Sequence, residues 1–219
     1  MWVNYPHMPT GASASIELFQ ELVDFGKKHS ILIVNDNPYS FILNDHPLSI
    51  LSVDGAKDVT LELNSLSKTF NMAGWRVGMV CGAKDKIEAV LKVKSNMDSG
   101  MFQGIQKGAI EALQLSKDWH EQINTVYASR RELIWELASH LGCTYDKNAN
   151  GLFVWSKLPK GVESISFIDN LLQEKNIFIA PGDIFGTRGK GYIRFSLCVP
   201  EAQIKEAMER CKIENKVRT

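Results

Sequence analysis

The alternation of apolar and polar positions predicts a layered α/β structure in the first part of this 219-residue chain. Residues 1–5 resemble the end of a strand, and residues 16–29 have apolar positions at helical spacing. Residues 31–34 then form a continuous apolar run, which is typical of a strand buried on both faces. The predicted apolar side of the helix consists of Ile16, Phe19, Leu22, Val23 and Phe25.

The same kind of spacing predicts further helices and strands, and a second domain. Beyond Gly142 the pattern changes to short strands and helices, typical of a smaller α+β domain. We expect two domains, residues 1–118 and 119–219, with a long helix over 117–141 as the bridge. Further predicted strands cover residues 59–63, 77–80, 151–155, 177–180 and 192–197, and further helices cover 84–97, 102–115, 166–174 and the segment after Pro200.

One lysine lies between two of the apolar runs, and polar residues surround it. Ser65 and Ser67 flank Lys68, and Arg76 follows eight residues later, so we expect a loop to present the amine. A lysine attacks an aldehyde only as the free amine, which a neighbouring cation favours. The donors of Arg76, with the two hydroxyls, suit a phosphate. This indicates pyridoxal phosphate as the ligand, and the alternative is a solvated lysine beside a surface arginine.

Polar residues also follow the apolar run at 31–34. Asp36 comes at the carboxyl end of this predicted strand, where ligand sites lie in open α/β sheets. An aspartate against a pyridine nitrogen keeps that nitrogen protonated and makes the ring an electron sink. Tyr39 is within reach of the ring's phenolate oxygen. A turn residue ahead of Pro38 is the open alternative for Asp36.

Arg194 interrupts the apolar strand predicted at residues 192–197. An arginine in such a strand is costly unless it is paired, and a substrate carboxylate fits its planar group of donors. Pairing with Asp183 or Glu201 is the alternative, and the sequence leaves both open.

Composition limits the partners and the compartment. The net charge is zero, so the chain has no charge signature for nucleic acid or an anionic membrane. Its four cysteines are far apart and its histidines lack metal-ligand spacing, so we expect no disulfide and no metal. We find no signal peptide and no long apolar span, which favours a cytoplasmic location.

Six stretches give the chain a specific resemblance. Over nearly its whole length it resembles the fold type I pyridoxal-phosphate enzymes, specifically the class I/II aminotransferases. The sequences of residues 68–78 and 94–100 resemble those of aspartate or LL-diaminopimelate aminotransferases. The six stretches, in order, are Asn4–Ala12, Asp36–Tyr39, Ser65–Phe70, Gly74–Gly78, Pro181–Gly186 and Tyr192–Ser196.

The resemblance implies a reaction and a set of site residues. It implies amino-group transfer between an aspartate-like or similar amino acid and a 2-oxo acid, through a Schiff base of pyridoxal phosphate on Lys68, in a homodimer. Lyases and decarboxylases of the same fold share these residues and stay an alternative. The implied catalytic residues are Lys68, Asp36 and Tyr39, the cofactor-binding residues are these three with Ser65, Ser67 and Arg76, and the substrate-binding residue is Arg194.

Two departures from the family pattern limit the resemblance. Met8 stands where the family usually has an asparagine that bonds the cofactor's phenolate oxygen. The family's phosphate loop and ring-stacking aromatic residue are not found in this sequence. We therefore interpret the chain as the carboxyl-terminal part of an aminotransferase that lacks the amino-terminal half, and the sequence leaves open whether it is active alone. A non-catalytic fragment or assembly module is the remaining alternative.

Overall fold

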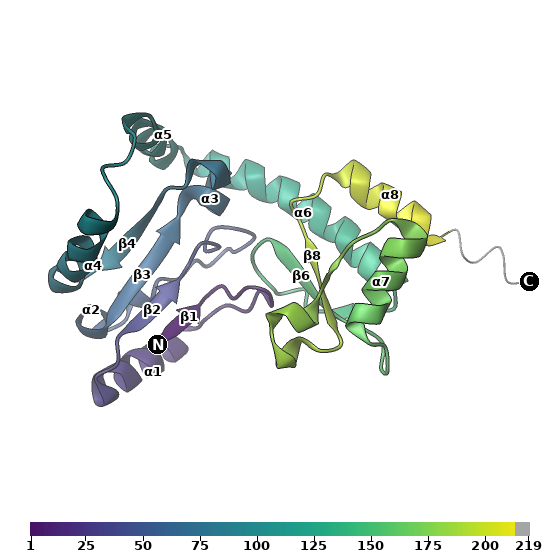
Figure 1. The fold of residues 1–219 in the computed structure, drawn as a ribbon, viewed down its shortest axis with the longest axis horizontal. Coiled ribbons are helices and arrows are strands. Elements are labelled where there is room, and N and C mark those ends of the chain that lie inside the picture. Colours follow the sequence, from purple (N-terminus) through teal and green to yellow (C-terminus); the bar gives the residue numbers. More distant parts are fainter. Residues whose placement is uncertain (213–219) are drawn as a thin grey trace, which may run out of the picture. The chain divides into compact units, whose positions relative to one another are not determined.

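The computed structural model describes residues 1–212, and these form two compact units (Figure 1). The first unit contains Met1–His7 and Ala12–Glu121, and the second contains Met8–Gly11 with the chain from Gln122 onward. The assignment of Met8–Gly11 to the second unit is not apparent from the hydrophobic pattern. The domain division expected after residue 118 falls in the first turn of helix α6 (Lys117–His140).

A four-stranded sheet forms the centre of the first unit. Its order is β1 (Trp2–Asn4), β2 (Ile33–Asp36), β3 (Thr60–Ser65) and β4 (Gly78–Gly82). The first three strands are parallel, and β4 runs antiparallel to β3. Strand β2 begins two residues later than its apolar run and includes Asp36. The predicted α/β fold is confirmed, and its sheet is mainly parallel.

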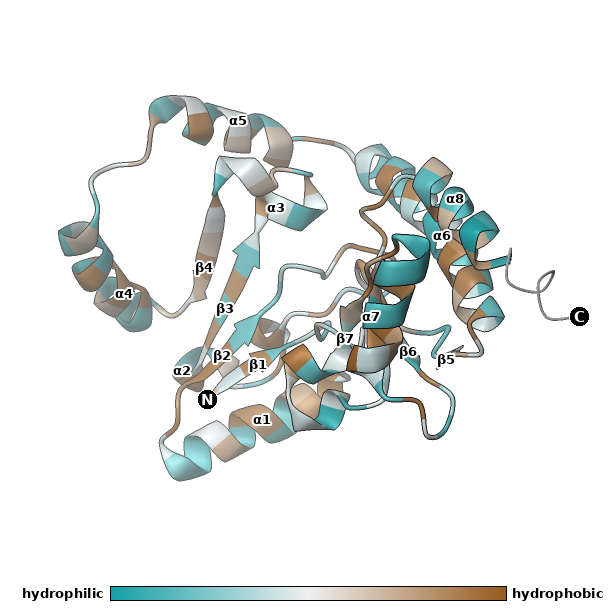
Figure 2. Cartoon of the chain, turned by 45° about the vertical axis from the view of Figure 1, so that its right-hand side comes forward, coloured by the Kyte–Doolittle hydropathy of each residue, from teal (hydrophilic) through white to brown (hydrophobic). Residues whose placement is uncertain are grey.

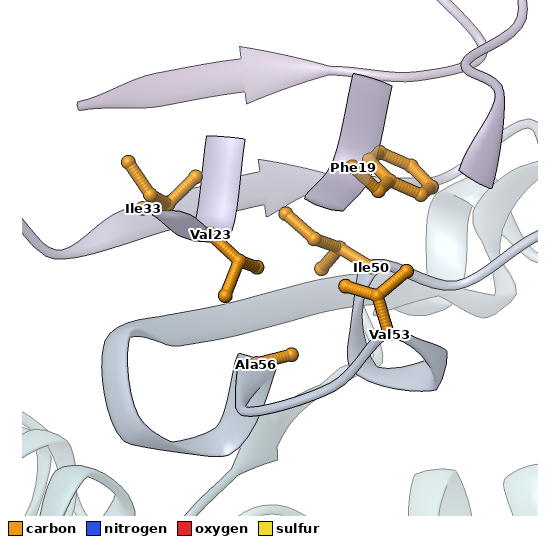
Figure 3. Close-up of a cluster of buried hydrophobic side chains, with 6 residues drawn as sticks. All are labelled: Phe19, Val23, Ile33, Ile50, Val53 and Ala56. Atoms are coloured by element: carbon orange, nitrogen blue, oxygen red, sulfur yellow. The ribbon is translucent and has the colours of Figure 1, made fainter. Parts of the chain in front are cut away.

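Helix α1 (Ile16–His29) packs against the sheet through a short apolar stripe. The Ser15 hydroxyl caps it by accepting from the Leu18 N–H at 3.2 Å. Its buried Phe19 and Val23 join one hydrophobic cluster (Figure 3). The expected apolar side was wrong at Ile16 and Phe25, which are exposed. Phe25 does not belong to the cluster, and its ring contacts His29 instead. The cluster consists of Phe19, Val23, Ile33, Ile50, Val53 and Ala56.

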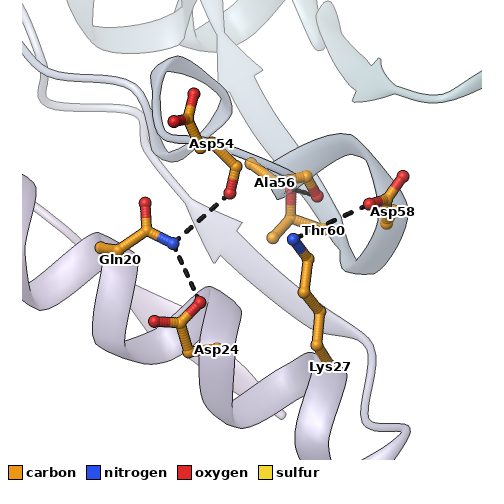
Figure 4. A network of polar contacts seen from close by, with 7 residues as sticks. All are labelled: Gln20, Asp24, Lys27, Asp54, Ala56, Asp58 and Thr60. Carbon is orange, nitrogen blue, oxygen red and sulfur yellow. Dashed lines mark hydrogen bonds and ion pairs between the residues drawn. The ribbon is translucent and has the colours of Figure 1, made fainter.

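Two short helices, η1 (Ile50–Ser52) and α2 (Ala56–Val59), connect β2 to β3. Polar contacts tie this connection to α1 (Figure 4). Gln20 donates to the Asp54 carbonyl at 3.4 Å, and the Lys27 amine lies 3.8 Å from the Asp58 carboxylate. The Thr60 hydroxyl donates to the Ala56 carbonyl at 2.8 Å. The connection is therefore tied to α1 at Asp54 and again at Asp58.

Helices α4 (Lys84–Met97) and α5 (Gln103–Leu113) follow β4, and α4 has its predicted bounds. No residue of α4 is buried, and Ala112 is the one buried residue of α5. Leu113, which we expected to face inward, is 55% exposed. Figure 2 shows apolar bands along both helices. Among the described residues, the apolar stripe of α4 therefore has no partner that buries it.

The second unit combines an antiparallel sheet with a layer of helices. Its elements after α6 are β5 (Thr144–Tyr145), β6 (Phe153–Lys157), α7 (Ser164–Lys175), β7 (Ala180–Pro181), η3 (Gly182–Phe185), η4 (Thr187–Gly189), β8 (Tyr192–Ser196) and α8 (Glu201–Lys212). The strand order is β5-β6-β8-β7. Buried Ile134 and Leu137 of α6, Ile168 of α7, and Ile204 and Met208 of α8 form the helical layer. The expected α+β part of the chain is confirmed.

Two predicted details of this sheet were wrong. A strand was expected over residues 177–180, but only Ala180–Pro181 pairs with β8. Ile177 and Ile179 are buried, yet neither pairs with β8. Strand β5 was missed, since two residues are too few to show a periodic pattern. No helix in residues 1–212 combines the length and apolar character that crossing a bilayer requires.

Candidate active site

The carboxyl ends of the parallel strands meet at one edge of the first unit's sheet. Asp36 ends β2 and Ser65 ends β3. The Asn37 N–H donates to the Leu63 carbonyl at 2.8 Å, and the Asn64 amide donates to the Asn37 carbonyl at 2.8 Å. These bonds continue the pairing of β2 and β3 past the last strand residues. The segments carrying Asp36 and Lys68 therefore leave the sheet side by side.

Lys68 lies on α3 (Leu66–Thr69), a single helical turn directly after β3. The expectation of a loop was therefore wrong. Ser65 explains the turn, because its hydroxyl caps it by accepting from the Ser67 N–H at 3.1 Å. Leu66 is buried with Met72 and Ala112, which anchors the turn from below. The half-buried Lys68 is thus attached to a short rigid segment.

Arg76 returns to the same edge ahead of β4, just after η2 (Ala73–Trp75). Its backbone is left-handed, with φ of 53°, and its guanidinium donates to the Ala73 carbonyl at 3.0 Å. The Leu66 N–H donates to the Val77 carbonyl at 3.2 Å, so the two ends of the 66–77 segment are joined. Arg76 is exposed. Arg76 therefore lies two residues ahead of β4, next to the turn that carries Lys68.

Asp36 borders a hollow of about 370 Å³ that is lined by Trp2, Val3, Asn4, Tyr5 and His7. Neighbouring atoms remove part of the water around its carboxyl group, which raises the pKa of Asp36. Burial lowers the pKa of His7, so this histidine favours its neutral form. A cationic N–H at Asp36 would offset the lost hydration of its carboxylate. The chemistry of this hollow therefore fits a protonated heterocycle.

Tyr39 is half-buried in the segment after β2, where its carbonyl accepts from the Ile42 N–H at 3.0 Å. The structure therefore attaches Tyr39 to the same edge of the sheet as Asp36. Its expected contact with the ring oxygen stays a prediction.

A buried polar network under this edge was missed by the sequence reasoning. Glu62 of β3 accepts from the amides of Asn35 and Asn37, at 3.2 and 3.3 Å, and from the Ile50 N–H at 2.9 Å. Asn35 in turn accepts from the Tyr5 N–H at 3.2 Å. Glutamate in the middle of an apolar run was the available signal, since a buried carboxylate requires partners. The network fixes both neighbours of Asp36 in the chain.

Arg194 lies in the middle of β8, in the second unit. The carbon at the centre of its guanidinium is 4.2 Å from the ring centre of Phe153 and 4.7 Å from that of Phe185. Its Nη1 donates to the Met8 sulfur at 3.2 Å. The Asp183 carboxylate accepts from the Ser164 hydroxyl. Two aromatic rings and a thioether therefore fix the plane of the guanidinium.

The predicted residues thus fall into two groups. Six of them lie at one edge of the first unit's sheet, and Arg194 lies in the second unit. The group in the first unit consists of Asp36, Tyr39, Ser65, Ser67, Lys68 and Arg76.

Comparison with known proteins decides the family. The model of the family described as aminotransferase class I and II matches residues 1–211. The chain belongs to the class I and II aminotransferases. The LL-diaminopimelate aminotransferases of Aquifex aeolicus and Halothermothrix orenii are 42% and 43% identical to it over 214 and 213 residues, covering 97% and 96% of this chain.

Solved structures of aminotransferases agree with this assignment. The apo structure of BacF from Bacillus subtilis matches with a TM-score of 0.91 at 34% identity, covering 98% of this chain and 56% of that one. A probable N-succinyldiaminopimelate aminotransferase from Thermus thermophilus matches with a TM-score of 0.89 at 31% identity, covering 96% and 57%.

The chain spans about half the length of the curated relatives it matches. The alignment covers 55% of both LL-diaminopimelate aminotransferases. The relatives therefore possess a further part, a little under half of their length, that this aminotransferase chain does not match.

Proposed function

We propose that this chain supplies the cofactor-holding lysine and the carboxylate-binding arginine of an aminotransferase that uses pyridoxal phosphate. The observation that carries the proposal is the position of Lys68. It lies on a capped turn that leaves the sheet beside Asp36, in a chain that matches the class I and II aminotransferases over residues 1–211.

Each residue at the sheet edge has a distinct task in this proposal. When bound, the cofactor supplies an electron sink that makes the substrate Cα–H acidic. Asp36 holds the ring nitrogen in its cationic form, which also offsets the lost hydration of the carboxyl group. Tyr39 donates to the ring oxygen.

The proton transfer is assigned to Lys68. Its amine takes the proton from the substrate Cα and would deliver it to the C4′ carbon of the cofactor. Lys68 thus acts first as general base and then as general acid. The capped turn suits this role, because a proton must move between fixed positions within hydrogen-bond reach. Leu66, two residues before Lys68, is buried, which anchors the turn that carries the amine.

Anion binding is divided between the two units. Ser65, Ser67 and Arg76 offer hydroxyls and a guanidinium to the cofactor phosphate. In the second unit, Arg194 offers its fixed guanidinium plane to the substrate α-carboxylate. Met8, whose sulfur accepts from Arg194, cannot donate a strong hydrogen bond to the cofactor's phenolate oxygen, so Tyr39 alone serves that oxygen.

The substrate class follows from the relatives' names. Relatives at 42% and 43% identity are named LL-diaminopimelate aminotransferases, so we take LL-diaminopimelate as the first amino donor to test, with 2-oxoglutarate as the acceptor.

The test follows the Cα proton directly. The chain is incubated with pyridoxal phosphate and α-deuterated LL-diaminopimelate, both alone and with the part of the Aquifex aeolicus enzyme that it does not match. We expect deuterium to pass into water and 2-oxo acid to form in the mixture, and both to stop in Lys68→Ala but not in the exposed control Lys57→Ala. Retained deuterium under both conditions would refute the proposal, and carbon dioxide in place of 2-oxo acid would indicate a decarboxylase.

A further inference from the structure

One methionine of the second unit lies directly against the candidate substrate arginine. The Nη1 atom of Arg194 donates to the Met8 sulfur at 3.2 Å, across 186 positions of sequence. A thioether sulfur is a weak acceptor, so it satisfies a charged donor poorly. Met8 is half-buried, which leaves a route to the sulfur for an oxidant as small as hydrogen peroxide.

Both partners are held in place by other contacts of the same unit. The Gly11 carbonyl, three residues after Met8, accepts from the Asn150 N–H at 2.8 Å. The carbon at the centre of the Arg194 guanidinium lies 4.2 and 4.7 Å from the centres of two aromatic rings. A change in the chemistry of the sulfur therefore acts on an arginine that has little freedom to move away.

Oxidation converts this weak acceptor into a strong one. The sulfur lone pair attacks one oxygen of hydrogen peroxide, an S–O bond forms, the O–O bond breaks and water leaves. The sulfur loses two electrons and the peroxide gains them. Hydrogen bonds with one charged partner are roughly twice as strong as neutral ones, and the sulfoxide oxygen would accept from a cation. The side chain of methionine has three rotatable bonds, so the new oxygen can turn toward the guanidinium.

We propose that Met8 is a site of reversible oxidation, and that its sulfoxide oxygen occupies the Nη1 donor that Arg194 would otherwise offer to a carboxylate. Peroxide is the oxidant. A methionine sulfoxide reductase returns the two electrons from a dithiol and releases the oxygen as water. The asparagine usual in the family carries no sulfur, so the site arises from the departure at residue 8. The effect on carboxylate binding rests on the proposed function of Arg194, whereas the oxidation of Met8 does not.

The first test locates the oxidation and reads the arginine directly. The chain, made with isotope-labelled arginine, is treated with hydrogen peroxide, its thiols are restored with dithiothreitol, and peptide mass locates each sulfoxide. In nuclear magnetic resonance, the guanidinium signal that is missing in Arg194→Lys identifies Arg194. We expect exchange of its Nη protons with water to slow about tenfold after oxidation and to recover after treatment with the reductase.

Two variants separate Met8 from the other methionines. Met8→Leu keeps the approximate size of the side chain and removes the sulfur, so its Arg194 signal should not respond to peroxide. Met97→Leu is the matched control, because Met97 is 80% exposed and lies on α4 of the first unit. Its Arg194 signal should respond as fully as that of the unsubstituted chain. Circular dichroism that matches the unsubstituted chain establishes that both variants are folded.

Binding of 2-oxoglutarate then tests the consequence for carboxylates. Calorimetry is carried out after catalase has removed the peroxide. We expect oxidation to weaken binding about tenfold in the unsubstituted chain and in Met97→Leu, and to leave binding by Met8→Leu unchanged. If the untreated chain did not bind 2-oxoglutarate, the proposed role of Arg194 would fail, and the resonance experiment would still decide whether Met8 is such a site.

Three results would overturn the inference. The first is a chain in which Met8 stays a thioether while Met97 is fully oxidised. The second is a fully oxidised Met8 beside an Arg194 signal that is the same as before treatment. The third is an equal loss of affinity for 2-oxoglutarate in Met8→Leu, because oxidation would then act elsewhere in the chain.

Discussion

Glu62→Ala is the substitution that best tests how the candidate site is built. The carboxylate accepts from three N–H groups, of Asn35, Asn37 and Ile50, all of which lie in buried residues. Truncation leaves these donors unsatisfied, at about 1–3 kcal/mol each before water enters. We therefore expect a loss of about 3 kcal/mol or more, which is a large part of a typical domain stability of about 5–15 kcal/mol.

Glu62→Gln separates the charge from the shape. The amide keeps one oxygen, but its NH₂ group then faces a donor, so we expect a smaller loss of about 1–2 kcal/mol. The assay is native-state hydrogen exchange of β2 and β3, because it reports the free energy of opening of the first unit alone. Glu88→Ala is the matched control, since Glu88 is exposed on α4 and its carboxylate lies 3.7 Å from the Lys84 amine. That exposed pair should contribute less than about 0.5 kcal/mol.

The reasoning would be refuted by a Glu62→Ala variant whose β2 amides exchange as slowly as those of the Glu88→Ala control. It would also fail if Glu62→Gln were as destabilising as Glu62→Ala, because the retained oxygen would then contribute nothing to the stability of the first unit.

Two further predictions concern a titrating group and a close backbone approach. Burial raises the pKa of Asp36, so the cofactor-free chain should lose stability as pH rises from the ordinary value of 3.8 through the raised value. Asp36→Asn should remove that loss, which melting curves across this pH window would reveal; an unchanged pH dependence would contradict it. Gly182→Ala should destabilise the second unit by about 1–3 kcal/mol in urea unfolding, because its Cβ would lie 2.1 Å from the Gly189 carbonyl oxygen. Gly74→Ala is its control, since its Cβ meets nothing within 4 Å, and equal losses would contradict the steric argument.

The hydrophobic pattern predicted where the helices and strands lie better than it predicted which of their residues are buried. Helix α4 has its predicted bounds, but none of its residues is buried among the described residues. Phe25 and Leu113 were expected inside and are exposed. Spacing indicates which residues share a side of a helix, whereas burial depends on what packs against that side.

Sequence motifs identified the candidate site residues. They did not identify the contacts that hold these residues in place. Lys68 was expected on a loop, yet the Ser65 hydroxyl caps a helical turn there. The network around Glu62 joins residues more than ten positions apart, which no local pattern reveals. The contact between Met8 and Arg194 joins residues at opposite ends of the chain. Such long-range contacts require the folded backbone.

Reductive trapping tests the central claim that this chain holds the cofactor through Lys68. Pyridoxal phosphate is added to the chain, borohydride fixes any imine, and peptide mass locates the adduct. The account predicts an adduct concentrated on Lys68, lost in Lys68→Ala and unaffected in Lys57→Ala. Labelling that is spread evenly over exposed lysines such as Lys57, with no preference for Lys68, would contradict it.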